Sequence, residues 1–318
     1  MNIVILERGT VGMDVSVDIL NELGNVTVYE KSKVNQVSER IRNADIVIAN
    51  KMPLSRHTLK DAANIKLIAQ FATGYDNIDI NYCREHGIAV CNISGYSTAS
   101  VVQHTFALAL ALYEHLPYYD TYVKNGSWAA QENFTHFHYT FNDLENKTWG
   151  VIGMGNIGRK VAAVASSLGC NVIWASTSDT MREEGYPQKT LEELLKECDI
   201  VSIHCPLNKS TKHLINGDTL KLMKSSAILV NVARGGVVDN AALTEALNEN
   251  IIAAAGVDVV EGEPISVNNP LNTIKDSNRL IITPHMAWGS LEARRRVVTE
   301  AYENIAAFLR GEKRNRII

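Results

Sequence analysis

The hydrophobic positions of this chain form short apolar runs separated by amphipathic stretches. Five runs lie in the first third of the sequence: Ile3–Leu6, Val26–Tyr29, Ile46–Ala49, Leu67–Phe71 and Ile88–Cys91. Six more follow Thr148: Trp149–Ile152, Val172–Trp174, Ile200–His204, Ile228–Val232, Ala255–Val259 and Leu280–Thr283. Strand-like runs that alternate with helical patterns predict an α/β protein with parallel sheets. The second series has the six strands of a complete dinucleotide-binding sheet.

Two helices and one irregular connection complete the predicted elements. Thr98–His115 is apolar on most faces, which is typical of a buried helix, and a last helix is predicted to start near Ser290. Between the two series of strands, Asn125–Asn146 follows neither period and predicts an irregular connection.

Length and composition limit the class of protein. A chain of 318 residues is about two domains long. The net charge of −4 gives no general basic field for nucleic acid, and Phe106–Tyr113, the most apolar stretch, is too short to cross a bilayer. The five cysteines are odd in number and form no C-x-x-C pair, which favours reduced thiols and a cytoplasmic location. We therefore expect a soluble protein with neither nucleic-acid nor membrane partners.

A glycine-rich loop follows the first run of the second series. Gly153, Gly155 and Gly158 form G-x-G-x-x-G, with Asn156 and Ile157 inside it and an amphipathic stretch after it. In this context the first glycine permits a tight turn, the second lets the backbone approach a pyrophosphate, and the third lets helix and strand pack closely. The loop predicts a dinucleotide site.

The residues after the next strand bear on which dinucleotide binds. A carboxylate is expected there to hold the ribose hydroxyls of NAD, but Ser176 occupies the position, followed by Thr177 and Ser178. Their hydroxyls can donate to a 2′-phosphate, and Arg182 is near in sequence. We favour NADP over NAD, although hydroxyls also accept NAD.

Three side chains with the chemistry of 2-oxo acid reduction follow the last three runs. Arg234, Glu263 and His285 would all lie at the carboxyl edge of the sheet, beside the glycine loop. A guanidinium can hold a substrate carboxylate, an imidazolium can donate a proton to the carbonyl oxygen, and a carboxylate can keep the imidazole protonated. The set predicts a nicotinamide-dependent dehydrogenase without a catalytic metal.

Ordered motifs along nearly the whole chain resemble those of the D-isomer-specific 2-hydroxy acid dehydrogenases, and of glycerate dehydrogenase (hydroxypyruvate reductase) members in particular. They are ATGYDNID from Ala72, GYSTASVVQHT from Gly95, GMGNIG from Gly153, HCPLNKSTKHLIN from His204, NVARGG from Asn231, DVVEGEP from Asp258 and TPH from Thr283. The resemblance implies that Arg234 binds substrate, that His285 is the acid/base and also borders the cofactor, and that Glu263 holds His285.

The resemblance also implies binding residues. Thr73 and Gly74 would hold the substrate carboxylate, and Met52, Tyr96 and Trp288 would line the pocket for the substrate side chain. The cofactor would contact a further set of residues after the strands: Thr105, His204, Cys205, Pro206, Val232, Ala233 and Asp258.

The family fold implies two doubly wound domains. A discontinuous flavodoxin-like substrate domain would comprise residues 1–98 and 288–318, and a Rossmann cofactor domain residues 99–287, through which family members usually form dimers. Gln103-His104 and Trp288 are similar to glycerate dehydrogenase members, so hydroxypyruvate and glyoxylate are the first-choice substrates. Larger aliphatic or aromatic 2-oxo acids remain open.

Three alternatives bear on function. A dinucleotide sensor without catalysis would not need the acid/base set, and formate oxidation on this fold is typical of members with Gln in place of Glu263. His136 and His138 form an H-x-H without a third ligand, so aromatic packing explains them better than a metal does.

Overall fold

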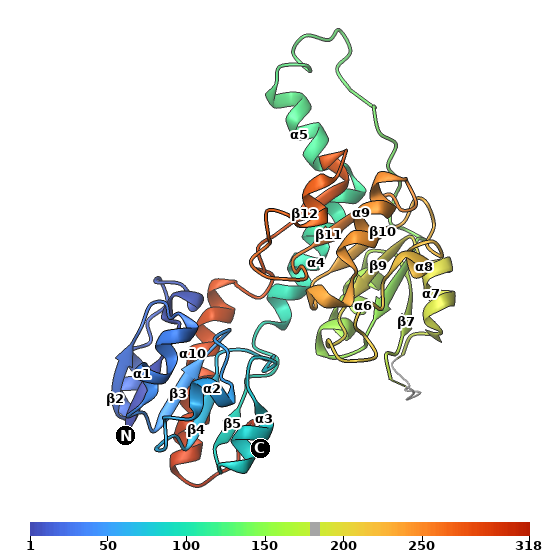
Figure 1. Cartoon of the computed structure of the whole chain (residues 1–318). Helices are drawn as coiled ribbons and strands as arrows, with labels where there is room; N and C mark the ends of the chain where they lie inside the picture. The colour runs from blue at the N-terminus through green and yellow to red at the C-terminus, as the bar shows by residue number, and fades with distance from the viewer. Residues whose placement is uncertain (179–184) are drawn as a thin grey trace. The chain divides into compact units, whose positions relative to one another are not determined.

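The computed structural model describes residues 1–178 and 185–318, and it divides the chain into two compact units. The first unit comprises Met1–Ser97 and Gly289–Ile318, and the second comprises Thr98–Trp288. The blue strands and the red C-terminal helix in Figure 1 belong to the first unit. Within the described residues, no helix is both long and apolar enough to span a bilayer.

The first unit is built on a five-stranded parallel sheet with the order β2-β1-β3-β4-β5. This is the doubly wound flavodoxin-like order, in which the chain reverses direction beside β1. Its strands are β1 (Asn2–Ile5), β2 (Asn25–Val28), β3 (Ile46–Ala49), β4 (Leu67–Gln70) and β5 (Ala89–Cys91). All five strands predicted for this part of the chain are confirmed.

Mostly short helices connect the strands of the first unit. They are η1 (Arg8–Val11), η2 (Asp18–Leu23), η3 (Val34–Gln36), α1 (Val37–Ile41), α2 (Arg56–Leu59), α3 (Ile80–Glu85) and α10 (Leu291–Leu309). The predicted last helix is confirmed as α10: the Ser290 hydroxyl caps it by accepting from the Ala293 amide at 3.2 Å. Its apolar side packs against β4, with Val297 and Ile305 fully buried.

The second unit contains a seven-stranded parallel sheet with the order β12-β11-β10-β9-β6-β7-β8. Its strands are β6 (Thr148–Ile152), β7 (Asn171–Ala175), β8 (Gln188–Lys189), β9 (Ile200–Ile203), β10 (Ile228–Asn231), β11 (Ala254–Val257) and β12 (Leu280–Ile282). The strand order reverses between β6 and β9, which is where doubly wound sheets bind dinucleotides. The six predicted strands are confirmed, and β8 is an additional edge strand.

Both faces of this sheet are buried, which explains its continuous apolar runs. Trp149, Val151 and Val230 point to the face covered by α4 (Thr98–Tyr113) and α6 (Asn156–Ser167). The opposite face is covered by three helices: α7 (Leu191–Glu197), α8 (Gly217–Leu220) and α9 (Asn240–Asn248). Short 3-10 turns complete the unit: η4 (Gly235–Val237), η5 (Pro270–Thr273) and η6 (Ser277–Arg279). The buried helix predicted from Thr98 is α4.

An arm projects from the second unit after α4. It consists of α5 (Leu116–Lys124) and residues 125–147, which contain neither helix nor strand, as predicted for the irregular connection. In Figure 1 the arm, drawn in green, extends away from the sheet of its own unit. His136 lies within the arm, stacked on Tyr122 at 3.8 Å between ring centroids, and its Nε2 is 2.9 Å from the Tyr118 hydroxyl.

Candidate active site

The glycine loop joins β6 to α6 and fits closely against the end of β9. Gly153 has φ +94°, and a Cβ there would lie 2.8 Å from the backbone nitrogen of Cys205. A Cβ at Gly158 would lie 2.2 Å from the carbonyl oxygen of Gly153, so α6 approaches the start of the glycine loop more closely than a side chain allows. Gly155, which caps α6, has open space where a Cβ would point. The loop therefore leaves a free approach to the amino end of α6, which attracts anions.

His204 follows β9 beside this loop. Neither ring nitrogen has a hydrogen-bond partner among the described residues, although both are shielded from solvent. Burial lowers the pKa of His204 to about 3, so the ring is neutral at ordinary pH. Buried polar atoms without partners are rare and call for an explanation. Together with the open approach at Gly155, they fit a bound dinucleotide.

The neighbouring residues of this edge lie as follows. Cys205 is buried, and burial raises the pKa of its thiol to about 11, which makes it a poor nucleophile. Pro206 is exposed. Thr105 is fully buried in α4, where its hydroxyl donates to the Val101 carbonyl at 2.8 Å. Its predicted approach to a pyrophosphate stays a prediction.

Ser176 lies directly after β7, next to the loop, since the Ala175 carbonyl accepts from the Gly153 amide at 3.0 Å. Its hydroxyl accepts from the Ser178 amide and lies near the Ser178 hydroxyl, both at 3.1 Å. Thr177 is half-buried between them. Arg182, which is near this site in sequence, lies outside the described residues.

Arg234 follows β10 in a turn held by a buried asparagine. The Asn231 side chain accepts from the Ala233 amide at 3.1 Å and donates to the Arg234 carbonyl at 3.0 Å. The Arg234 guanidinium is half-buried and donates to the Ala233 carbonyl at 2.8 Å, and Val232 before them is buried. The turn therefore fixes the arginine at the carboxyl edge of the sheet.

Glu263, in the loop after β11, meets His285, in the segment after β12. His285 Nδ1 lies 2.6 Å from a carboxylate oxygen of Glu263, and the two side chains are 21% and 32% exposed. The other Glu263 oxygen accepts from the Val260 amide at 3.2 Å. His285 has φ +53°, and its amide donates to the Asp258 carbonyl at 2.8 Å. A strained backbone that the surroundings hold in place is typical of functional sites.

Asp258 is 2% exposed and fastens the segment that carries His285. One carboxylate oxygen accepts from the Thr283 hydroxyl at 2.6 Å and the Met286 amide at 2.8 Å, and the other from the Ala287 amide at 2.9 Å. Three of about four acceptor positions are thus used within the protein. The contact to the nicotinamide carboxamide stays a prediction.

The His104 side chain contacts two residues of the site, although the sequence did not assign it there. Its Nε2 lies 2.9 Å from the Thr283 hydroxyl and 3.6 Å from the Asp258 carboxylate. Its sequence signal is the Gln103-His104 pair, which by itself assigns no role to the histidine.

The residues predicted for substrate binding lie in both units. Met52 and Tyr96 are buried in the first unit, Thr73 is exposed there, and Trp288 is the half-buried last residue of the second. The Thr73 hydroxyl donates to the Ile93 carbonyl at 2.7 Å. Gly74 presents its carbonyl to the buried Gln70 amide at 3.1 Å.

A carboxylate that the sequence did not single out organises the loop of Met52. One oxygen of Glu7 accepts from three successive amides, those of Asn50, Lys51 and Met52, at 3.1, 2.9 and 2.7 Å. These contacts join residues more than 40 positions apart, so no local sequence pattern predicts them.

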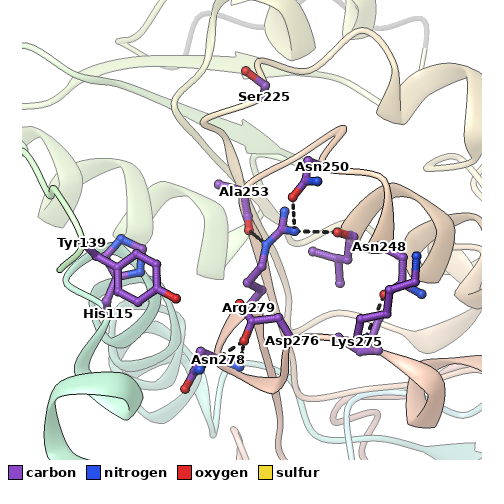
Figure 2. Close-up of a pocket in the computed structure, with 12 residues that line it drawn as sticks. His115, Tyr139, Ser225, Asn248, Asn250, Ala253, Lys275, Asp276, Asn278 and Arg279 are labelled. Carbon is purple, nitrogen blue, oxygen red and sulfur yellow. Dashed lines mark hydrogen bonds between the residues drawn. The ribbon is translucent and has the colours of Figure 1, made fainter. Parts of the chain in front are cut away.

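A separate cavity of about 560 Å³ lies at the opposite edge of the second sheet. It is lined by residues that precede β10, β11 and β12, and by His115 and Tyr139 (Figure 2). Arg279 in its wall donates to the carbonyls of Leu247 and Ala253 at 2.6 and 2.7 Å. The cavity is therefore remote from the carboxyl edge. Among residues 1–178 and 185–318, no three His, Cys, Asp or Glu side chains are grouped to hold a metal ion.

Comparison with known proteins identifies the family of this fold and site. The NAD-binding domain of D-isomer specific 2-hydroxyacid dehydrogenases matches residues 106–287. A hydroxypyruvate reductase of Blautia hydrogenotrophica is 36% identical over 93% of this chain and 92% of its own. A glyoxylate reductase of Aeropyrum pernix is 40% identical over 80% of this chain and 76% of its own.

A solved structure of an acyclic imino acid reductase with NADPH and D-arginine has a TM-score of 0.90 and 29% identity, and it covers 100% of both chains. This chain belongs to the D-isomer specific 2-hydroxyacid dehydrogenases, a family of nicotinamide-dependent oxidoreductases.

Proposed function

We propose that this protein reduces a small 2-oxo acid to the D-2-hydroxy acid, with hydroxypyruvate or glyoxylate as substrate and NADP(H) preferred over NAD(H). The 2.6 Å pair of His285 and Glu263 carries the proposal, because a carboxylate-held imidazole is the proton donor that carbonyl reduction requires. The names of the similar reductases of Blautia hydrogenotrophica and Aeropyrum pernix support the choice of substrates.

Each catalytic side chain has a distinct role in this mechanism. A reduced nicotinamide, when bound, would supply the hydride to the carbonyl carbon. His285 Nδ1 is engaged by Glu263, so the other ring nitrogen, Nε2, is the one that donates a proton to the carbonyl oxygen. Glu263 stabilises the protonated imidazole before the transfer. Arg234 binds the substrate carboxylate and polarises the carbonyl through charge-assisted hydrogen bonds.

The cofactor would be held at the carboxyl edge of the second sheet. Backbone amides at the start of α6, at Asn156 and Ile157, are free of helical partners and would bind the phosphates. Ser176 and Thr177 would donate to the 2′-phosphate of NADP. The residues proposed to border the rest of the dinucleotide are Thr105, His204, Cys205, Pro206, Val232, Ala233 and Asp258.

The first unit is proposed as the substrate-binding domain and the second as the dinucleotide-binding domain. Thr73 and Gly74 would hold the substrate carboxylate, and Met52, Tyr96 and Trp288 would line the side-chain pocket. Bulky lining residues suit either a small pocket or an apolar one, so larger 2-oxo acids are the alternative substrates.

Loss of absorbance at the nicotinamide band tests the function. We expect oxidation of NADPH with hydroxypyruvate or glyoxylate, and slower oxidation with phenylpyruvate. His285→Ala is expected to lower kcat by about 10²–10⁴-fold while dinucleotide affinity is retained, because the acid is removed and the glycine loop is not. An unchanged kcat would contradict the assigned role.

A dinucleotide sensor is the alternative from another functional class. It predicts that wild-type protein binds the dinucleotide but turns over none of the acids. Formate oxidation is less favoured, because Glu263 stands where such members have glutamine.

We also propose a homodimer and a cytoplasmic location. The arm exposes a concentration of large apolar side chains, among them Trp128, Phe134 and Phe137 at 48%, 87% and 78% exposed, which is typical of an interface. Light scattering should give the molar mass of a dimer for the wild-type protein. The double variant Phe134→Ser/Phe137→Ser should dissociate more readily. Val267→Ser, at an equally exposed apolar residue outside the arm (89%), should not. The five cysteines are all buried free thiols, which suits a reducing compartment.

A further inference from the structure

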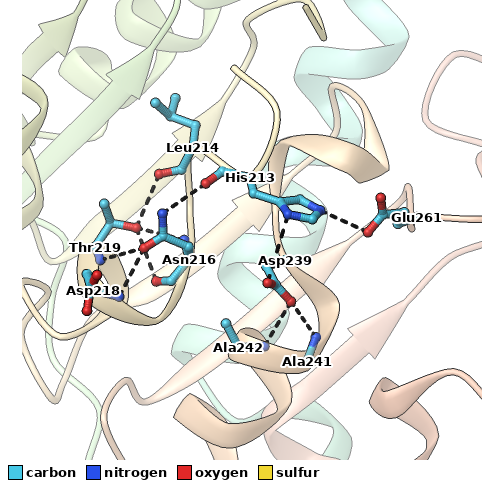
Figure 3. A network of polar contacts seen from close by, with 9 residues as sticks. All are labelled: His213, Leu214, Asn216, Asp218, Thr219, Asp239, Ala241, Ala242 and Glu261. Atoms are coloured by element: carbon cyan, nitrogen blue, oxygen red, sulfur yellow. Dashed lines mark hydrogen bonds and ion pairs between the residues drawn. The ribbon is translucent and has the colours of Figure 1, made fainter. Parts of the chain in front are cut away.

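His213 lies in the segment between β9 and α8 and contacts two other loops of the carboxyl edge. Its amide donates to the Gly236 carbonyl at 2.8 Å, and its Nε2 lies 3.0 Å from a carboxylate oxygen of Glu261 (Figure 3). Nδ1 is 4.0 Å from the Asp239 carboxylate. Gly236 is two residues after Arg234, and Glu261 is two residues before Glu263. His213 therefore joins the two loops that carry proposed catalytic side chains.

The segment that holds His213 is itself firmly attached. Thr211 is fully buried, and its hydroxyl donates to the Pro206 carbonyl at 2.7 Å. On the other side, the Asn216 side chain donates to the His213 carbonyl at 3.0 Å and caps α8. Asp239 likewise caps α9. The His213 side chain thus extends from a backbone that is held on both sides, and it can restrain a residue on a less constrained loop.

Glu261 is that residue. It lies on an exposed loop that runs from 261 to 268, with its side chain 45% exposed. The same loop carries Glu263, whose carboxylate must face His285. A contact at Glu261 limits the directions in which the Glu263 side chain can turn.

The backbone conformation of His213 indicates that its side chain matters. It has φ +49°, in the left-handed region, where glycine is unstrained and asparagine is well tolerated. Either residue would satisfy the backbone, but neither reaches Glu261 as the imidazole does. The histidine adds the contact across loops.

We propose that His213 is a positioning residue. Through Glu261 it holds the 258–264 loop, the segment that directly follows β11, so that Glu263 faces His285. The proposal rests on the proposed function of the Glu263–His285 pair. It requires no contact of His213 with substrate or cofactor.

His213→Asn tests the proposal, because it keeps a residue suited to positive φ and removes the reach to Glu261. We expect kcat for the 2-oxo acid to fall by about three- to tenfold, the range for one lost hydrogen bond, with KM and dinucleotide affinity unchanged. Glu261→Ala should give the same fall, and the double variant no further one. Glu261→Gln keeps an acceptor and should retain more activity than Glu261→Ala.

His115→Asn is the matched control. His115 is also a histidine in the left-handed region, with φ +56°, but it lines the cavity at the opposite edge of the sheet (Figure 2). It should leave kcat unchanged. Additive effects of the His213 and Glu261 substitutions, or an unchanged kcat in His213→Asn, would overturn the proposal.

Amide hydrogen exchange of residues 258–263 in the dinucleotide-bound protein gives a readout that is independent of turnover. We expect faster exchange in His213→Asn than in wild type or in His115→Asn. If wild-type protein reduces no 2-oxo acid, the proposed function fails, while equal exchange rates would refute the positioning role itself.

Discussion

Gly235→Ala is expected to separate catalysis from cofactor binding. A Cβ at this position would lie 2.0 Å from the carbonyl carbon and oxygen of Val260 and 2.5 Å from the Glu261 nitrogen. All three are backbone atoms, so no side-chain rotation relieves the clash. The 258–264 loop must move away from the turn that carries Arg234.

The size of the effect follows from these distances. To reach 3.0 Å, below which Cβ contacts are essentially not found, the loop must recede by about 1 Å. The same displacement of Glu263 would lengthen its 2.6 Å contact with His285 to about 3.6 Å, which is no longer a hydrogen bond. A misplacement of about 1 Å costs about 10²-fold in rate, equivalent to about 2.7 kcal/mol. Overpacking would also lower stability by about 1–3 kcal/mol.

Steady-state kinetics with hydroxypyruvate and dinucleotide titration by fluorescence measure the two effects separately. We expect kcat/KM to fall by about 10²-fold and the dissociation constant of the dinucleotide to rise by much less, since the glycine loop proposed to bind the phosphates follows a different strand. Gly236→Ala is the control: its Cβ would meet the end of the flexible Leu207 side chain at 3.1 Å. Equal activity in the two variants would refute the reasoning.

Three further predictions concern residues in both units. Ser176→Asp should shift the ratio of kcat/KM values from NADPH toward NADH, because a carboxylate repels a 2′-phosphate; an unchanged ratio counts against Ser176 as the determinant. In cofactor-free protein, His204, whose ring nitrogens are shielded from solvent, is neutral and contributes stability above pH 6.5. This stability is lost as the pH falls toward 3, by about 1.4 kcal/mol per pH unit, because the unfolded chain takes up the proton first. Urea unfolding measures this: between pH 7 and pH 5, the free energy of unfolding of His204→Phe should fall by about 2 kcal/mol less than that of wild type. An identical fall in both proteins would show that His204 is not the source of the pH dependence. Glu7→Gln should lower the free energy of unfolding by about 1–3 kcal/mol and raise KM for the 2-oxo acid, and an unaltered KM would argue against Met52 in the pocket.

The strands were predictable because a sheet buried on both faces needs continuous apolar runs. Every predicted run is a strand of one of the two sheets. Among the described residues, the strand without a predicted apolar run is β8, which consists of Gln188 and Lys189 at the edge of the second sheet. Both are half-buried polar residues, and an edge strand of two residues carries no apolar signal.

Residue types and their places after strands likewise came from the sequence. The sequence itself contains the glycine spacing. The common location of the glycine loop, Arg234, Glu263 and His285 followed from one rule, that the carboxyl ends of parallel strands meet at one edge. The sequence did not reveal the contacts between loops, such as those of His213 with Glu261, 48 positions apart, and of Glu7 with Met52, 45 apart.

The sequence by itself therefore determined the class of fold, the edge proposed to carry the chemistry and the residues that follow its strands. Apart from the Glu263–His285 pair, which the family resemblance implied, the tertiary structure alone decided which side chains of that edge touch one another. Periodicity and propensity act over a few neighbouring residues, so they specify elements. The order β10-β9-β6 and the close approach of Gly235 to Val260 depend on how distant elements pack, which no local pattern encodes.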